Sequence, residues 1–115
     1  MNPDELRTRT RAFSLRVVKL VQTLPKNMIA DVLGKQVLRC ATSVGANYRA
    51  ACRAQSGAMF IAKLSIVVEE ADETVYWLEL IRDASLVKPE LLAELIDEAE
   101  QILKIMAASR KTARN

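Results

Sequence analysis

Apolar residues recur every three or four positions along almost the whole chain, which is the spacing of one face of an α-helix. No stretch alternates apolar and polar residues for long enough to indicate a β-strand. Breaks in the periodicity occur at Pro25, at Gln55-Ser56-Gly57 and between Asp83 and Lys88. The pattern therefore predicts four helices, which span about residues 3–24, 28–54, 57–83 and 89–109.

The residues at the predicted helix ends support these boundaries. Asn2 precedes a proline and two carboxylates, an order typical of an N-cap and a first helical turn. Pro25 cannot continue the hydrogen-bond ladder of the first helix, and Asn27 can cap the second. Pro89 suits the first position of the fourth helix. The segment 109–115 is basic and poor in apolar residues, so we expect it to fray.

The same spacing predicts which side chains face inward. One side of the second helix is expected to consist of Ile29, Leu33, Val37, Cys40, Val44, Tyr48 and Ala51. Gly34 and Gly45 interrupt this helix, and each costs about 1 kcal/mol relative to alanine, which indicates a close approach of another backbone. The third helix is apolar over more than one face. Four amphipathic helices with short connections predict an all-α, antiparallel up-down-up-down four-helix bundle.

Composition limits the chemistry that the chain can perform. With 115 residues, half of them hydrophobic, the chain is long enough for one core, so we expect a single domain over residues 1–115. It contains no histidine, the commonest general base and metal ligand. Cys40 and Cys52 lie roughly 18 Å apart along one predicted helix, too far for a disulfide. Phosphate-binding glycine loops and nucleophile elbows are missing. We therefore expect no enzyme, no metal and no cofactor.

Two further patterns bear on location. No apolar run approaches the roughly 18 residues that a membrane span requires. The first residues also lack the basic and apolar regions of a secretory signal. We expect a cytoplasmic protein with no membrane partner.

Positive and negative charges are separated along the chain. Residues 1–63 contain 11 Lys or Arg and 3 Asp or Glu, a net charge of +8, whereas residues 64–103 contain 2 and 11, a net charge of −9. The basic part can bind nucleic acid, or the two parts can neutralise each other within the bundle or across a subunit interface. The candidate phosphate contacts are Arg7, Arg9, Arg11, Arg16 and Lys19 in the first helix and Arg49, Arg53 and Lys63 around the turn between the second and third.

A polar strip borders the apolar face of the second helix. It consists of Arg39, Ser43 and Asn47, spaced four residues apart. If the second and third helices fold back antiparallel, Ser43 lies near Glu69 and Arg39 lies near Glu73. These charge-assisted and neutral hydrogen bonds would form an interhelical clamp. The alternative is a ligand or catalytic pocket built on Glu69, Glu70 and Glu73, which lacks a histidine.

Three segments together resemble a known family. Residues 39–51, which include the Arg39, Ser43 and Asn47 strip, are followed by residues 60–64 and by the glutamate-rich segment 69–80, which holds Trp77. The chain thereby resembles the four-helix bundle family of 23S rRNA intervening-sequence proteins. Members often have an acidic residue after the asparagine of the second helix, where this chain has Tyr48 and Arg49. The surface at this point is correspondingly more basic.

The resemblance implies a small bacterial bundle that assembles into a ring-like homopentamer. A relative with the same fold, the accessory protein of diversity-generating retroelements, is thought to bind nucleic acid and a reverse transcriptase through a basic surface. Two functions follow for this chain. The first is a non-enzymatic, oligomeric scaffold that binds RNA or DNA through the basic surface. The alternative is an interaction module that docks a larger protein such as a reverse transcriptase, with the charges serving self-assembly.

Overall fold

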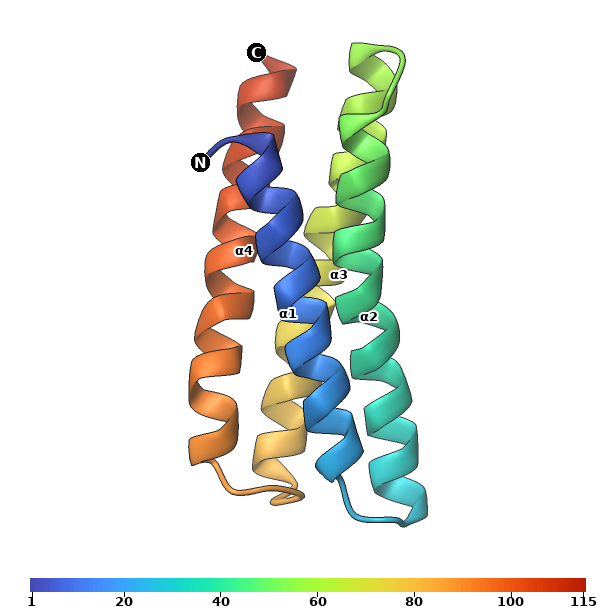
Figure 1. Ribbon diagram of the computed structural model, residues 1–115, viewed down its shortest axis with the longest axis vertical. Helices are drawn as coiled ribbons and strands as arrows, with labels where there is room; N and C mark the ends of the chain where they lie inside the picture. The colour runs from blue at the N-terminus through green and yellow to red at the C-terminus, as the bar shows by residue number, and fades with distance from the viewer.

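Four α-helices and no β-strand make up the computed structural model, which describes residues 1–115. The helices are α1 (Pro3–Thr23), α2 (Met28–Cys52), α3 (Gly57–Asp83) and α4 (Glu90–Arg114). Each helix runs antiparallel to the one before it, and both chain ends lie at the same end of the molecule (Figure 1). α1 packs against α2 and α4, and α3 closes the bundle from behind by packing against the same two helices. The all-α, four-helix prediction is confirmed.

Side-chain caps define where three of the helices begin. The side chain of Asn2 accepts a hydrogen bond from the backbone N–H of Glu5 at 2.8 Å, and that of Asn27 accepts one from Ala30 at 2.8 Å. Ser56 caps α3 in the same way. Each cap satisfies a backbone donor that the helix itself leaves unpaired. The polar residues in the connections therefore fix the points at which the chain reverses.

One continuous core holds the helices together. It contains 20 buried residues drawn from all four helices, among them Phe13, Val37, Leu78 and Ile102. The buried hydroxyl of Thr10 donates to the carbonyl of Leu6 at 2.8 Å, and no buried side-chain polar atom lacks a partner. The core is therefore apolar, and the few polar side chains buried in it have their hydrogen bonds formed.

The backbone of α1 comes close to α2 beside Gly45. A Cβ atom added there would touch the carbonyl oxygen of Thr10 at 3.6 Å and the hydroxyl of Ser14 at 3.5 Å. The same hydroxyl reaches across to the carbonyl of Ala41 at 3.1 Å. At Gly34 the neighbour is instead a side chain, that of Leu24. The predicted approach of a backbone therefore holds at Gly45 and not at Gly34.

α4 continues to Arg114 rather than ending at residue 109, because Lys111 and Arg114 place cations at the negative end of its dipole. Ile29, predicted to face inward, is 61% exposed, because its neighbour Ala30 is the residue of the first turn of α2 that faces the core. Cys40 and Cys52 are both free, and Cys40 is buried. None of the helices is long and apolar enough to cross a membrane.

Candidate nucleic-acid interface

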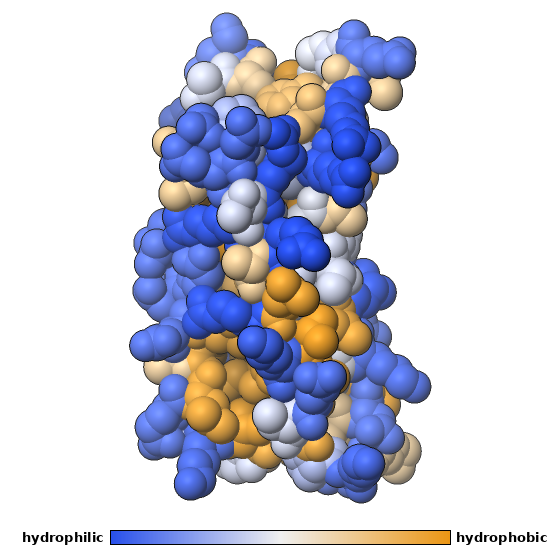
Figure 2. All heavy atoms as spheres, viewed as in Figure 1, coloured by the Kyte–Doolittle hydropathy of each residue, from blue (hydrophilic) through white to orange (hydrophobic).

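A groove lined by arginines runs along the seam between the N-terminal half of α1 and the C-terminal half of α2. Its volume is about 680 Å³. The lining residues are Arg7, Thr8, Arg11, Ser14, Thr42, Gly45, Ala46, Arg49 and Arg53. There is no carboxylate among them, and we call this site the arginine groove. Strongly hydrophilic side chains gather along this half of the seam, with paler residues between them (Figure 2).

The antiparallel helices place two cations on each wall of the groove. Arg7 and Arg11 are one turn apart on α1, and Arg53, the residue that caps the end of α2, follows Arg49 by one turn, so each pair spans about 6 Å along its helix axis. The floor is formed by small residues where the helices come close, beside Gly45. The result is a concave strip with guanidinium groups on both sides.

Three of the four guanidinium groups are free of protein partners. Arg7 forms an ion pair with the exposed carboxylate of Asp4. Arg11, Arg49 and Arg53 are exposed and take part in none of the ion pairs of the chain. A guanidinium has five fixed donors that match the oxygens of a phosphate. The groove can therefore bind an extended anion without breaking an internal contact, apart from the one to Asp4.

The structure places Arg9 outside the groove. Its Nε and Nη2 donate to the two carboxylate oxygens of Glu98 at 2.8 and 2.6 Å, and Nη2 also donates to Gln101 at 2.8 Å. The hydrogen bond to Glu98 is the main reason why the pKa of Arg9 is raised. Because its donors are occupied, Arg9 ties α1 to α4 instead of facing a ligand.

The other predicted phosphate contacts also lie elsewhere. Arg16 and Lys19 face α4 and line a separate depression of about 250 Å³, together with leucine side chains such as Leu91. Arg16 is 4.0 Å from the carboxylate of Glu94. Lys63 is on α3 and is not part of the arginine groove. Of the eight predicted cations, the structure thus brings together Arg7, Arg11, Arg49 and Arg53.

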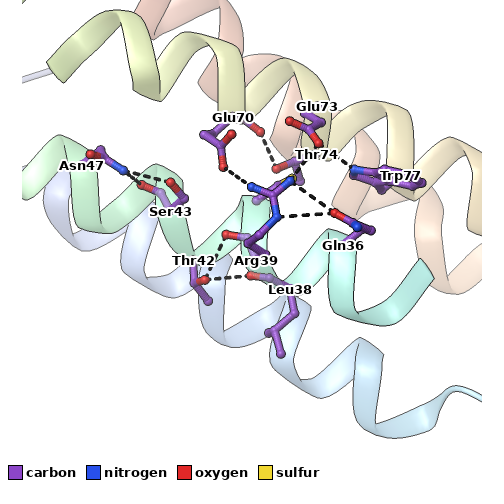
Figure 3. Close-up of polar contacts among 11 residues, drawn as sticks. Gln36, Leu38, Arg39, Thr42, Ser43, Asn47, Glu70, Glu73, Thr74 and Trp77 are labelled. Atoms are coloured by element: carbon purple, nitrogen blue, oxygen red, sulfur yellow. Dashed lines mark hydrogen bonds and ion pairs between the residues drawn. The ribbon is translucent and has the colours of Figure 1, made fainter. Parts of the chain in front are cut away.

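A second polar cluster links α2 to α3. The guanidinium of Arg39 donates to Glu73 at 2.9 Å and to Glu70 at 3.2 Å, and it also lies within reach of Gln36 (Figure 3). Glu73 in turn accepts a hydrogen bond from Nε1 of Trp77 at 3.2 Å. The contact between Arg39 and Glu73 is the one that the antiparallel register predicts.

The remaining members of the predicted clamp do not bridge the helices. Asn47 donates to the hydroxyl of Ser43 at 2.8 Å, within α2 itself (Figure 3). Glu69 is exposed and forms no ion pair, whereas Glu70 contacts Arg39. The reason is helical geometry, since residues three apart share a face and adjacent ones do not. Glu70 and Glu73 therefore face α2 together, and Glu69 turns away.

The cluster also contains groups of the kind that bind metals. The sulfur of Cys40 and carboxylate oxygens of Glu70 and Glu73 lie within 4.8 Å of one another. Nη2 of Arg39 is 3.3 Å from that sulfur and contacts Glu73 as well. Burial raises the pKa of the Cys40 thiol to about 12, so it stays protonated at neutral pH, unlike a nucleophilic thiolate. The arrangement is that of a clamp whose charges are already paired.

Sequence reasoning missed the floor of the arginine groove. Thr8, Ser14, Thr42 and Ala46 are not charged and carry no motif. Gly45 was the available signal, because a glycine inside a helix marked the place where α1 comes close. On α2, Thr42 and Ala46 lie three residues before and one residue after Gly45, and Ser14 of α1 is the nearest side chain across the seam.

Residues 5–108 match the sequence profile described as 23S rRNA-intervening sequence protein. Among solved structures, it is similar to a protein of unknown function from the S23 ribosomal protein family of Bacteroides thetaiotaomicron, with 36% identity and a TM-score of 0.88. That similarity covers 96% of this chain and 99% of the other. No curated protein matches.

The clamp predicts a pH-dependent contribution of Glu73 to stability. The pKa of Glu73 is held below its ordinary value, chiefly by the hydrogen bond from Trp77, with Arg39 adding to the effect. Glu73→Gln should therefore lower the free energy of unfolding at pH 7. The deficit should begin to shrink once the pH falls below the ordinary glutamate pKa of about 4.3, where the unfolded carboxyl takes up a proton, and it should vanish below the lowered pKa of the folded carboxylate. Urea unfolding at neutral pH and in acid below that lowered pKa measures the deficit.

Glu69→Gln is the matched control, because it removes the same charge from an exposed carboxylate without an ion-pair partner. It should unfold like the wild type at both pH values. A Glu73→Gln deficit that is equal at neutral and acidic pH would contradict the role of the charged clamp.

Proposed function

Because this chain belongs to the family of 23S rRNA-intervening sequence proteins, we propose that it is a non-enzymatic scaffold that binds RNA through the arginine groove. The observation that carries the proposal is the convergence of four arginines on one groove without a carboxylate. Phosphates give nucleic-acid complexes most of their affinity, and they attract such a surface without regard to sequence. A protein that binds RNA in this way would act in the cytoplasm.

The chemistry of the remaining side chains supports a binding role rather than catalysis. Nucleophilic or acid–base catalysis needs a group that is free to react and whose pKa suits its task. The Cys40 thiol is protonated and buried, and Glu73 is bound by both Arg39 and Trp77. These groups are committed to holding α2 against α3.

The proposal predicts salt-sensitive RNA binding that depends on the groove. Arg49→Gln with Arg53→Gln removes two phosphate contacts, so the affinity for a labelled RNA hairpin should fall. The slope of log K against log salt concentration should become shallower by about 1 to 2. Fluorescence anisotropy over a salt series measures both quantities.

Arg16→Gln with Lys19→Gln is the matched control, because it removes the same charge from the α1 face that points toward α4. It should bind nearly as the wild type does. Equal losses in the two double variants would mean that net charge, and not the groove, determines binding. Absence of binding by the wild type at low salt would overturn the proposal.

A second candidate function, self-assembly and partner docking, is favoured by an exposed apolar patch at the start of α2. Met28, Ile29 and Val32 are 78%, 61% and 52% exposed and lie on adjacent turns. Exposed apolar patches of this kind are typical of protein interfaces. A ring-like homo-oligomer, such as a pentamer, would cover the patch with another copy. A larger protein partner such as a reverse transcriptase could then dock on the assembled ring.

Assembly predicts a solution mass well above the 12.8 kDa of one chain, measured by light scattering. Ile29→Glu with Val32→Glu should shift the mass toward the monomer, because two carboxylates would have to be buried in the interface. Gln22→Glu with Gln55→Glu adds the same charge at exposed polar positions and should leave the mass unchanged. A monomeric wild type, or an unchanged mass for the patch variant, would contradict this role of the patch.

A further inference from the structure

The arginine groove contains no aromatic side chain. Among the aromatic residues of the chain, Phe13 and Tyr48 are buried in the core, and Phe60, Tyr76 and Trp77 are on α3, away from the groove. Proteins that bind single strands without sequence preference rely on aromatic side chains, on which successive bases stack. A groove without such a surface gains nothing from unpaired bases. It is suited to a duplex, in which the bases stay paired and the sugar–phosphate backbone is the part presented.

Two of the hydroxyl groups that line the groove already donate within the protein. The Ser14 hydroxyl lies 3.1 Å from the carbonyls of both Thr10 and Ala41, and the Thr42 hydroxyl lies 2.7 Å from that of Leu38. A hydroxyl has a single hydrogen, which these backbone carbonyls bind, so the lone pairs of the Ser14 and Thr42 oxygens are left to accept a hydrogen bond from a ligand. The third hydroxyl, that of Thr8, has no partner in the protein and can donate to a phosphate as the arginines do.

The arginines and these two hydroxyl groups therefore differ in hydrogen-bonding character. The guanidinium groups of Arg11, Arg49 and Arg53 donate, and the floor hydroxyls of Ser14 and Thr42 accept. A ribose–phosphate strand offers the complementary pair, since its phosphates accept and its 2′-hydroxyls donate. A deoxyribose strand offers only the phosphates. Double-stranded RNA is recognised mainly through its phosphates and 2′-hydroxyls, without reading the bases.

We infer that the arginine groove is selective for the backbone of double-stranded RNA, with the walls bound to phosphates and the Thr42 hydroxyl accepting a hydrogen bond from a ribose 2′-hydroxyl. This inference rests on the proposed function and specifies its ligand. On this account, the groove distinguishes RNA from DNA by the ribose 2′-hydroxyl. It favours a duplex over a single strand because it has no aromatic side chain on which unpaired bases could stack.

The test compares three probes of the same sequence at one salt concentration: an RNA duplex, the corresponding DNA duplex, and one unstructured RNA strand. The full-length wild-type protein should bind the RNA duplex tightest. Thr42→Val keeps the shape of the side chain and removes the acceptor, so affinity for the RNA duplex should fall about two- to tenfold. Affinity for the DNA duplex should not change. Circular dichroism verifies that the variant is folded.

Thr23→Val is the matched control. The Thr23 hydroxyl also donates to a backbone carbonyl of its own helix, that of Leu20 at 2.7 Å, but it lies outside the groove. Its affinities for the three probes should equal those of the wild type. A selective loss for RNA in Thr42→Val alone would support the 2′-hydroxyl contact.

Two further outcomes distinguish duplex-RNA selectivity from RNA binding by the arginine groove in general. Equal wild-type affinity for the RNA and DNA duplexes, or tighter binding of the single strand, would overturn the inference and leave the proposed function standing, provided that Arg49→Gln with Arg53→Gln still weakens binding. No binding to any of the three probes at low salt would overturn the proposed function together with the inference.

Discussion

The antiparallel packing of α1 on α2 is the constraint on which the rest of the account depends. The connection between them is only a few residues long, so the start of α1 must lie beside the end of α2. Their apolar stripes face the common core, which sets the rotation of each helix. Gly45 then lets the two backbones approach. Four arginines from distant parts of the sequence converge on one groove as a consequence.

The separation of charge along the chain has two outcomes in the folded molecule. Some of the basic residues are neutralised by the acidic second half, as in the ion pairs of Arg9 with Glu98 and of Arg39 with Glu70 and Glu73. These pairs join α1 to α4 and α2 to α3, so they fix neighbouring helices against each other. The α1–α2 seam lies between two basic segments, and no carboxylate lines the arginine groove there. The unpaired charge therefore collects there.

Much of the fold could be predicted from the sequence, because helix periodicity and capping are local properties. The four helices and most of the buried faces required nothing more. The predictions were wrong where the outcome depends on the exact rotation of a helix or on a neighbouring helix. Ala30, and not Ile29, faces the core at the start of α2, and Arg9 is bound by Glu98 on a helix far away in sequence. Glu69 and Glu70 are adjacent residues, and the register of α2 against α3 that the sequence suggests is too approximate to decide which of the two faces Arg39.

The most direct test of the account is to titrate the protein with an RNA duplex at constant salt and follow the Nε–Hε resonances of its arginines by NMR. Arg11, Arg49 and Arg53 should shift, because their guanidinium groups are unpaired and line the groove. Arg9 and Arg39 should not, because carboxylates already hold them. Shifts at Arg9 and Arg39 with the groove resonances unchanged would contradict the claim that bundle packing creates the RNA-binding site.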